Sequence, residues 1–107
     1  MSEQHRTESD RSVNEAALGY WALSIEGRPT CHMALNRLPV DGGRGVYLEG
    51  CAKDLATIVA WRGSGPAIEL VDGGGEVVVR LTATAEGGWR GEDRQGRAVS
   101  LALSPMV

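Results

Sequence analysis

The chain has 107 residues, which is enough for one domain with a modest hydrophobic core. Its net charge at pH 7 is −3, and its basic side chains are interspersed with acidic ones, so the composition gives no support for nucleic-acid binding. Its apolar runs are far shorter than the roughly 20 residues that a membrane-spanning helix needs. Because the chain has no Phe, the aromatic core must come from Trp21, Trp61 and Trp89.

The N-terminal segment, residues 1–11, is almost wholly polar, and we expect a flexible arm there. No apolar stretch follows Met1, so the protein is either cytosolic or begins after a leader peptide that has been removed. Ser12 and Glu15 have the spacing of a capping box, which predicts a short helix that ends near Gly19. We expect the folded domain to cover residues 12–107.

The stretch 19–25 organises the rest of the chain. Trp21, Leu23 and Ile25 alternate with smaller or more polar residues, which is the period of a strand with one buried face. Further strands are expected at residues 31–36, 46–49, 58–62, 67–71, 76–82, 87–92 and 98–103. Between them we expect a loop from Pro39 to Gly45 and a single helical turn over residues 53–56.

The clearest hairpin surrounds residues 72–75, where Asp-Gly and Gly-Gly pairs supply the backbone angles of a tight turn. In its second strand the alternation points Val77 and Val79 inward and Val78 outward. Glu69 and Glu76 lie on either side of the turn and are expected to face water. A catalytic site built on paired carboxylates therefore has little support.

The number and spacing of these strands predict an all-β fold, an eight-stranded antiparallel up-and-down barrel of the lipocalin-like kind, because closure removes exposed strand edges. A two-sheet sandwich is the structural alternative. A barrel of this size is either filled by side chains or holds one small ligand. The residues expected to face the interior are Trp21, Leu23, Ile25, Met33, Leu35, Val46, Leu48, Trp61, Ile68, Leu70, Val77, Val79, Leu81, Trp89, Val99, Leu101 and, at the end of the last strand, Leu103.

Catalysis is not expected of this chain. His5 lies in the arm and His32 on the outward face of a strand, so the chain assembles neither a catalytic triad nor a metal site of its own, and no cofactor is implied. Cys31 and Cys51 would form a disulfide in an exported protein and two reduced thiols in a cytosolic one, and the sequence does not decide between them. A bridge would close a loop of about 20 residues and stabilise the fold by about 3 kcal/mol.

Several short patterns follow one another along the chain. They are Gly19-x-Trp21-x-Leu23, Cys31-x-Met33-x-Leu35, Gly50-Cys51, Trp61-Arg62, Ile68-x-Leu70-x-Asp72-x-x-Gly75 and Gly88-x-x-Gly91. In this order they resemble the bacterial alkaline-protease inhibitor family, small periplasmic proteins that block serralysin-type zinc metalloproteases. The resemblance covers about residues 12–104 and implies an eight-stranded barrel, an oxidised Cys31–Cys51 pair and a periplasmic location.

In that family the N-terminal arm enters the protease cleft and places its terminal group at the catalytic zinc, which keeps one coordination position open. The resemblance assigns this role to Ser2, Glu3, Gln4, His5 and Arg6. The barrel, with Trp21, Leu23, Trp61 and Trp89 in its core, would act as a rigid stop. The expected protein is thus a monomeric inhibitor, and its partner a serralysin-type zinc metalloprotease. Two other functions are open: a lipocalin-like module that binds a small apolar ligand inside the barrel, and a structural domain of the cell envelope.

Overall fold

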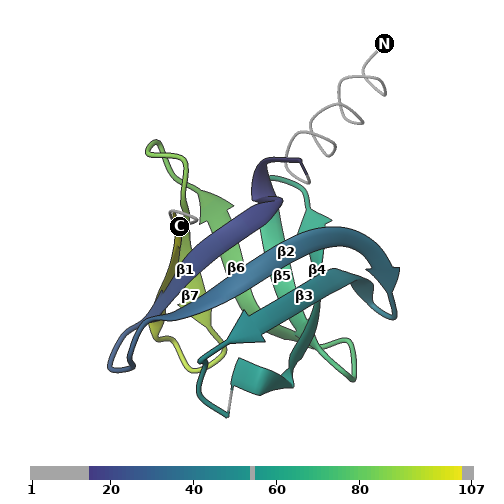
Figure 1. Ribbon diagram of the computed structural model, residues 1–107, viewed down its shortest axis with the longest axis horizontal. Helices are drawn as coiled ribbons and strands as arrows, with labels where there is room; N and C mark the ends of the chain where they lie inside the picture. Colours follow the sequence, from purple (N-terminus) through teal and green to yellow (C-terminus); the bar gives the residue numbers. More distant parts are fainter. Residues whose placement is uncertain (1–14, 54, 105–107) are drawn as a thin grey trace.

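In a computed structural model of the protein, which describes residues 15–53 and 55–104, eight antiparallel strands close into a barrel (Figure 1). The strands are β1 (Gly19–Ile25), β2 (Cys31–Val40), β3 (Gly43–Glu49), β4 (Ile58–Ser64), β5 (Ala67–Asp72), β6 (Val77–Ala83), β7 (Trp89–Asp93) and β8 (Ala98–Leu103), and a 3-10 turn, η1 (Leu55–Thr57), precedes β4. β8 pairs with β1 in a register that runs from Trp21–Leu103 to Ile25–Val99. The predicted barrel is therefore confirmed, and the two-sheet sandwich is wrong. Within the described ranges, no helix has the length and apolar character needed to cross a membrane.

The interior of the barrel is filled by side chains that alternate along the strands. Trp21, Trp61 and Trp89 are all buried. The indole N–H groups of Trp21 and Trp61 donate to the carbonyl oxygens of Ala17 and Asn36, each at 2.9 Å, so neither buried donor lacks an acceptor. Other predicted interior residues that are buried are Leu23, Ile25, Met33, Leu35, Ile68, Leu70, Val79, Leu81, Val99 and Leu101. The ones that are only partly buried are Val46, Leu48 and Val77.

The hairpin between β2 and β3 is longer than the sequence predicted. The expected loop from Pro39 to Gly45 is wrong, because β2 continues to Val40 and β3 already begins at Gly43. The tip of this hairpin lies against β4: a Cβ atom on Gly43 would overlap the carbonyl oxygen of Trp61. Only glycine allows so close an approach of two backbones, and this contact between distant segments is not visible in the local pattern.

β6 contains a valine whose orientation the alternation predicted wrongly. The register of β5 with β6 shifts between Leu70, which pairs with Val79, and Val71, which pairs with Val77. The bulge leaves Val78 without a partner residue across the ladder. Its side chain is buried rather than directed outward into water, and it lines a pocket of about 200 Å³ together with Leu55 of η1.

Glu69 is also buried, which corrects the expectation that it faces water. Only 9% of the residue is exposed, because Arg62 on β4 and Arg80 on β6 are its direct neighbours across the sheet. The Arg62 Nε donates to one carboxylate oxygen at 2.9 Å, and an Arg80 guanidinium nitrogen donates to the other at 2.7 Å. Both oxygens therefore carry charge-assisted hydrogen bonds that offset the loss of water. Glu76, in contrast, is exposed as predicted.

Gly91 on β7 offers a direct test of how tightly the barrel is packed. A Cβ atom at this position would overlap the carbonyl oxygen of Arg80 on the neighbouring strand. We expect Gly91→Ala to lower the free energy of unfolding by about 2–3 kcal/mol, since the backbones must move apart. Gly73→Ala is the control because no other part of the protein lies within 4 Å of where a Cβ atom on Gly73 would be. Urea unfolding monitored by Trp fluorescence gives the free energy of unfolding of each variant. Equal unfolding midpoints for Gly91→Ala and the wild type would contradict the prediction.

Candidate functional site

One end of the barrel carries the base of the N-terminal segment. β1, β3, β5 and β7 begin at this end, and β2, β4, β6 and β8 end there. Residues 15–17 form a single helical turn immediately before β1 (Figure 1). We call this end the arm-side rim and define it by residues 15–18, the β2–β3 hairpin tip at 37–43, the β6–β7 turn at 84–88, and Leu103.

The helical turn is fixed to the barrel by its contact with the core. Ala17 is fully buried, and its carbonyl oxygen accepts the hydrogen bond from the Trp21 indole. The ion pair between Glu15 and Arg37 spans 3.1 Å, but both side chains are mostly exposed, so it contributes little. The orientation in which the chain enters the barrel is therefore set by Ala17 and Trp21.

The residues predicted to act on a protease lie outside the part of the chain that the structure describes. These residues are Ser2, Glu3, Gln4, His5 and Arg6, and they stay a prediction. The same holds for the capping box that begins at Ser12 and for the assignment of residues 1–11 as a flexible arm. Glu15, the last residue of that capping box, is the first described residue.

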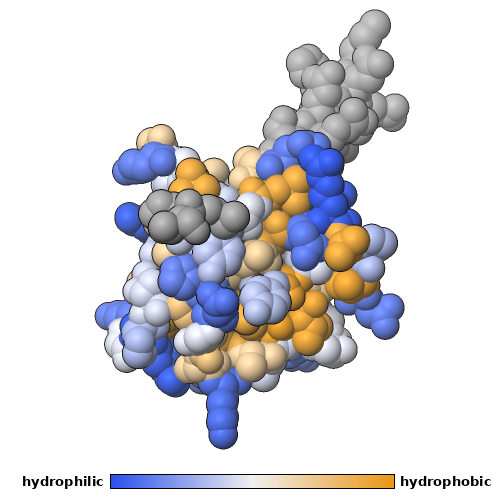
Figure 2. Space-filling model, viewed as in Figure 1, coloured by the Kyte–Doolittle hydropathy of each residue, from blue (hydrophilic) through white to orange (hydrophobic). Residues whose placement is uncertain are grey.

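Large apolar side chains are exposed at the arm-side rim. Leu38 is 67% exposed and Leu103 is 68% exposed. Val40 is also exposed, and it lies with Leu38 at the end of β2, whereas Leu103 ends β8. The expectation that Leu103 faces the interior is therefore wrong: its backbone pairs with Trp21, but its side chain lies at the open edge. Figure 2 shows hydrophobic surface on the side of the molecule formed by β2 and β3. Exposed apolar clusters of this kind are typical of protein-binding surfaces.

The sequence analysis missed Leu38 and Val40 as functional candidates. Val40 falls in the expected loop from Pro39 to Gly45, and Leu38 falls between that loop and the strand expected at residues 31–36. These two large apolar residues lie next to a hairpin turn, where polar residues are usual, and that pattern could have identified them as candidates for binding.

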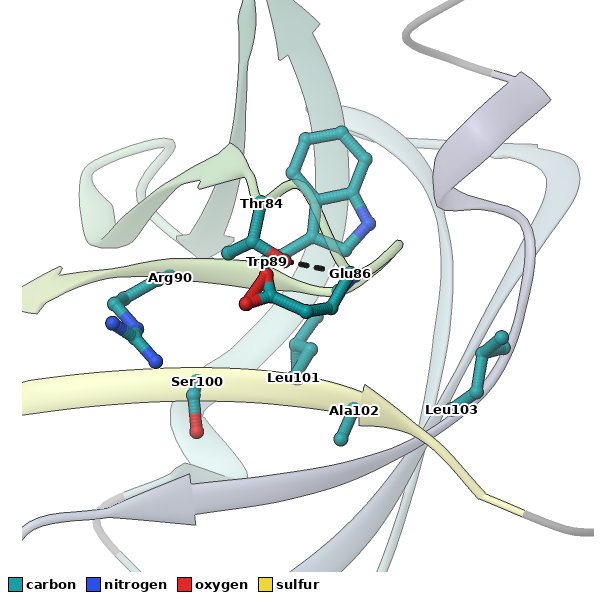
Figure 3. Close-up of a pocket in the computed structure, with 9 residues that line it drawn as sticks. Thr84, Glu86, Trp89, Arg90, Ser100, Leu101, Ala102 and Leu103 are labelled. Carbon is teal, nitrogen blue, oxygen red and sulfur yellow. Dashed lines mark hydrogen bonds between the residues drawn. The ribbon is translucent and has the colours of Figure 1, made fainter.

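A pocket of about 270 Å³ lies beside this rim, between the β6–β7 turn and β8 (Figure 3). Its polar lining includes Glu86, Arg90 and Ser100, and Leu103 lies at its edge. Thr84 fixes the turn, since its hydroxyl accepts a hydrogen bond from the Gly88 amide at 3.1 Å. The lining contains neither a nucleophile beside a base nor a set of metal ligands. The pocket is therefore better suited to binding a side chain of a partner than to catalysing a reaction.

The opposite end of the barrel is held by two aspartates in its turns. Asp93 accepts hydrogen bonds from the Gln95 and Arg97 amides, both at 2.9 Å, and from the Arg97 Nε at 2.8 Å. Burial by itself raises the pKa of Asp93, but these donors outweigh it and hold the pKa below its ordinary value. Asp72 in the β5–β6 turn also has a lowered pKa, because the Glu76 and Gly74 amides and Arg94 donate to it.

The two cysteines form a disulfide, as the family resemblance implied. The bond joins Cys31 at the start of β2 to Cys51 just after β3, with 5.0 Å between their Cα atoms. His32 lies half-buried on the outer face, as expected. Across residues 15–53 and 55–104, no group of three or more His, Cys, Asp and Glu side chains is arranged to hold a metal ion.

The described residues thus form a small disulfide-bridged antiparallel barrel with an exposed apolar rim at the end where the N-terminal segment joins. The chain belongs to the protease inhibitor Inh family, whose model matches residues 12–102. Membership supports the role of a protease inhibitor.

Two further comparisons show known proteins that the chain is similar to. The chain is 31% identical over 90 residues to a protein named outer membrane lipoprotein omp19 homolog from Rhizobium meliloti (strain 1021), covering 84% of this chain and 50% of that protein. The chain therefore spans about half the length of this relative. A solved structure titled as the crystal structure of a psychrophilic marine protease MP inhibitor has the same fold, with a TM-score of 0.60 and 14% identity over 86% of this chain and 99% of the other.

The lowered pKa of Asp93 predicts a specific pH dependence of stability. The Asp93 carboxylate binds its proton less readily in the folded chain than in the unfolded chain. Its contribution to stability is therefore complete above the unfolded-state pKa of about 3.9, and it is lost as the pH falls through the lower pKa of the folded state. Asp93→Asn should therefore be less stable than the wild type at pH 7, and the difference should shrink on acidification to about pH 3. Glu92→Gln, an exposed neighbour, is the control. Thermal unfolding from pH 7 to 3 measures this, and parallel curves for the wild type and Asp93→Asn would refute it.

Proposed function

We propose that the protein inhibits a secreted serralysin-type zinc metalloprotease by inserting its N-terminal arm into the protease active-site cleft. The observation that carries this proposal is family membership over residues 12–102, and the shape of the arm-side rim agrees with it. The inhibitor role follows from the family; the metalloprotease target and the use of the arm are the proposed refinements.

The chemistry of the target explains how an arm can inhibit it. A catalytic zinc keeps one position for water, and an amine, carbonyl or carboxylate can occupy that position instead. Five extended residues such as Ser2 to Arg6 reach about 17 Å, which is enough to enter a cleft. The exposed Leu38 and Leu103 at the rim would then rest on the protease surface around the cleft.

The rigidity of the barrel supports this arrangement. Ala17 is locked into the core through Trp21, so the depth to which the arm enters would be limited by a part of the protein that does not rearrange. A preformed stop reduces the entropy that is lost when the complex forms.

We also propose that the protein acts in the cell envelope, in the periplasm. The Cys31–Cys51 disulfide is typical of proteins in an oxidising compartment. The relative from Rhizobium meliloti is named as an outer membrane lipoprotein, which agrees with an envelope location for this chain.

The alternative of a ligand-binding module has less support. Its ligand would have to lie inside the barrel, but Trp21, Trp61, Met33 and Leu70 occupy that space as almost fully buried side chains. The structure offers no specific observation in favour of a purely structural envelope domain.

The arm can be tested by deleting residues 2–6. We expect the shortened protein to lose inhibition of a serralysin-type protease, because no group would reach the zinc, and to keep the melting temperature of the full chain, because the barrel is unchanged. A short Gly-Ser extension before Met1 should also weaken inhibition, since it changes which group arrives at the metal. Titration of the protease against each oxidised protein gives the inhibition constants. Undiminished inhibition by the deletion variant would exclude the arm mechanism.

A further inference from the structure

The chain has only two tyrosines, and both lie on the outer face of β1–β3. Tyr20 on β1 is paired with Ala34 on β2, and Ala34 is paired with Tyr47 on β3. Neighbouring strands are about 4.8 Å apart, so about 10 Å separates the two tyrosine backbones, with only a methyl group between them. These strands lie side by side toward the viewer in Figure 1. We call Tyr20, His32, Tyr47 and Glu49 the tyrosine patch.

The patch is held in place by its own contacts. The Tyr20 ring stacks on the His32 ring with a centroid distance of 5.4 Å and an angle of 2° between the planes. The Tyr20 hydroxyl donates to Glu49 Oε1 at 3.0 Å. The Tyr20 ring and the Glu49 carboxylate therefore have little freedom left to lose on binding, whereas Tyr47 remains 59% exposed.

Among the described residues, no basic side chain forms an ion pair with the carboxylate of the patch. The carboxylates of Glu69, Asp72 and Asp93 each pair with an arginine, but none of the ion pairs among the described residues includes Glu49. The hydrogen bond to Glu49, desolvation and the nearby negative charge of Glu49 raise the pKa of Tyr20. A carboxylate on the same strand face as the exposed Tyr47 ring is suited to a cation, which gains both an ion pair and contact with the ring.

We propose that the tyrosine patch receives an arginine or lysine side chain of the protein that this inhibitor binds. This inference rests on the proposed function, because the partner is the protease that the arm enters. Tyr20 is only two residues beyond Leu18 at the arm-side rim, so a protein that encloses the arm comes close to this face of the barrel. Tyrosines and arginines are the residues most often responsible for binding energy at protein interfaces.

The first experiment tests the chemistry of the patch without a protease. A capped tri-arginine peptide is titrated into the isotope-labelled oxidised protein, and a capped tri-citrulline peptide, which has the same shape without the charge, is the matched control. We expect amide NMR shifts to change at Tyr20, His32, Tyr47 and Glu49 with the arginine peptide only, and these changes to be lost in Glu49→Gln. An absence of shifts, or equal shifts in wild type and Glu49→Gln, would overturn the proposal.

The second experiment tests the role of the patch in inhibition. Glu49→Gln and Tyr47→Ala should each weaken inhibition of the serralysin-type protease about five- to tenfold at low salt, with a smaller effect of Glu49→Gln at high salt because the charge is then screened. Glu92→Gln removes the same charge from an exposed strand position on β7 and should leave inhibition unchanged.

The outcomes separate this inference from the proposed function. If the arm deletion abolishes inhibition but Glu49→Gln and Tyr47→Ala inhibit like the wild type, the patch is not a docking site and the proposed function stands. If Glu92→Gln weakens inhibition as much as Glu49→Gln, net charge rather than the patch is responsible, and the inference is wrong. If the wild-type protein inhibits no protease, the proposed function fails, and the docking inference fails with it even where the peptide titration is positive.

Discussion

The pairing of β1 with β8 is the constraint on which the rest of the structure depends. It places β1 between two neighbours, so the backbone polar groups of this first strand are satisfied on both sides. The same pairing fixes Trp21 in the interior, and the Trp21 indole in turn holds the Ala17 carbonyl. The position from which the N-terminal segment leaves the barrel therefore depends both on barrel closure, which fixes Trp21, and on the local hydrogen bond between Trp21 and Ala17.

The two ends of the barrel differ in how their surfaces are stabilised. At the far end, Asp72, Asp93 and Arg94 join two turns through hydrogen bonds and an ion pair, and the disulfide ties the start of β2 to the chain after β3. At the arm-side rim, large apolar residues such as Leu38 and Leu103 remain exposed. Exposed apolar area of this kind favours association with another protein and lowers solubility when it stays uncovered, so its presence at this end is consistent with a rim that binds a partner.

The eight strands could be predicted because each has one face in the core, and that alternation is a local property of the sequence. What could not be predicted required knowledge of which strands are neighbours. Glu69 is buried because Arg62 and Arg80 flank it across two different ladders, and Gly43 lies against β4 through a contact between segments that are far apart in sequence. The bulge at Val78 likewise depends on how β5 and β6 are aligned. The candidate arm, residues 2–6, carries no local pattern that reveals its role, and only the resemblance to a family pointed to it.

The proposed docking at the tyrosine patch would give the arm and the barrel different roles in binding. In the proposed mode of inhibition, an arm of a few residues would present groups that any metalloprotease zinc could accept, so it would supply affinity with little discrimination among targets. The Glu49 carboxylate, held by the Tyr20 hydroxyl, would favour a cation at one place on the partner's surface, and a partner with an acidic residue there would be repelled. Because Tyr20 lies on β1, near the point where the N-terminal segment joins the barrel, the spacing between the proposed arm contact and the proposed charge contact would become part of what the inhibitor recognises.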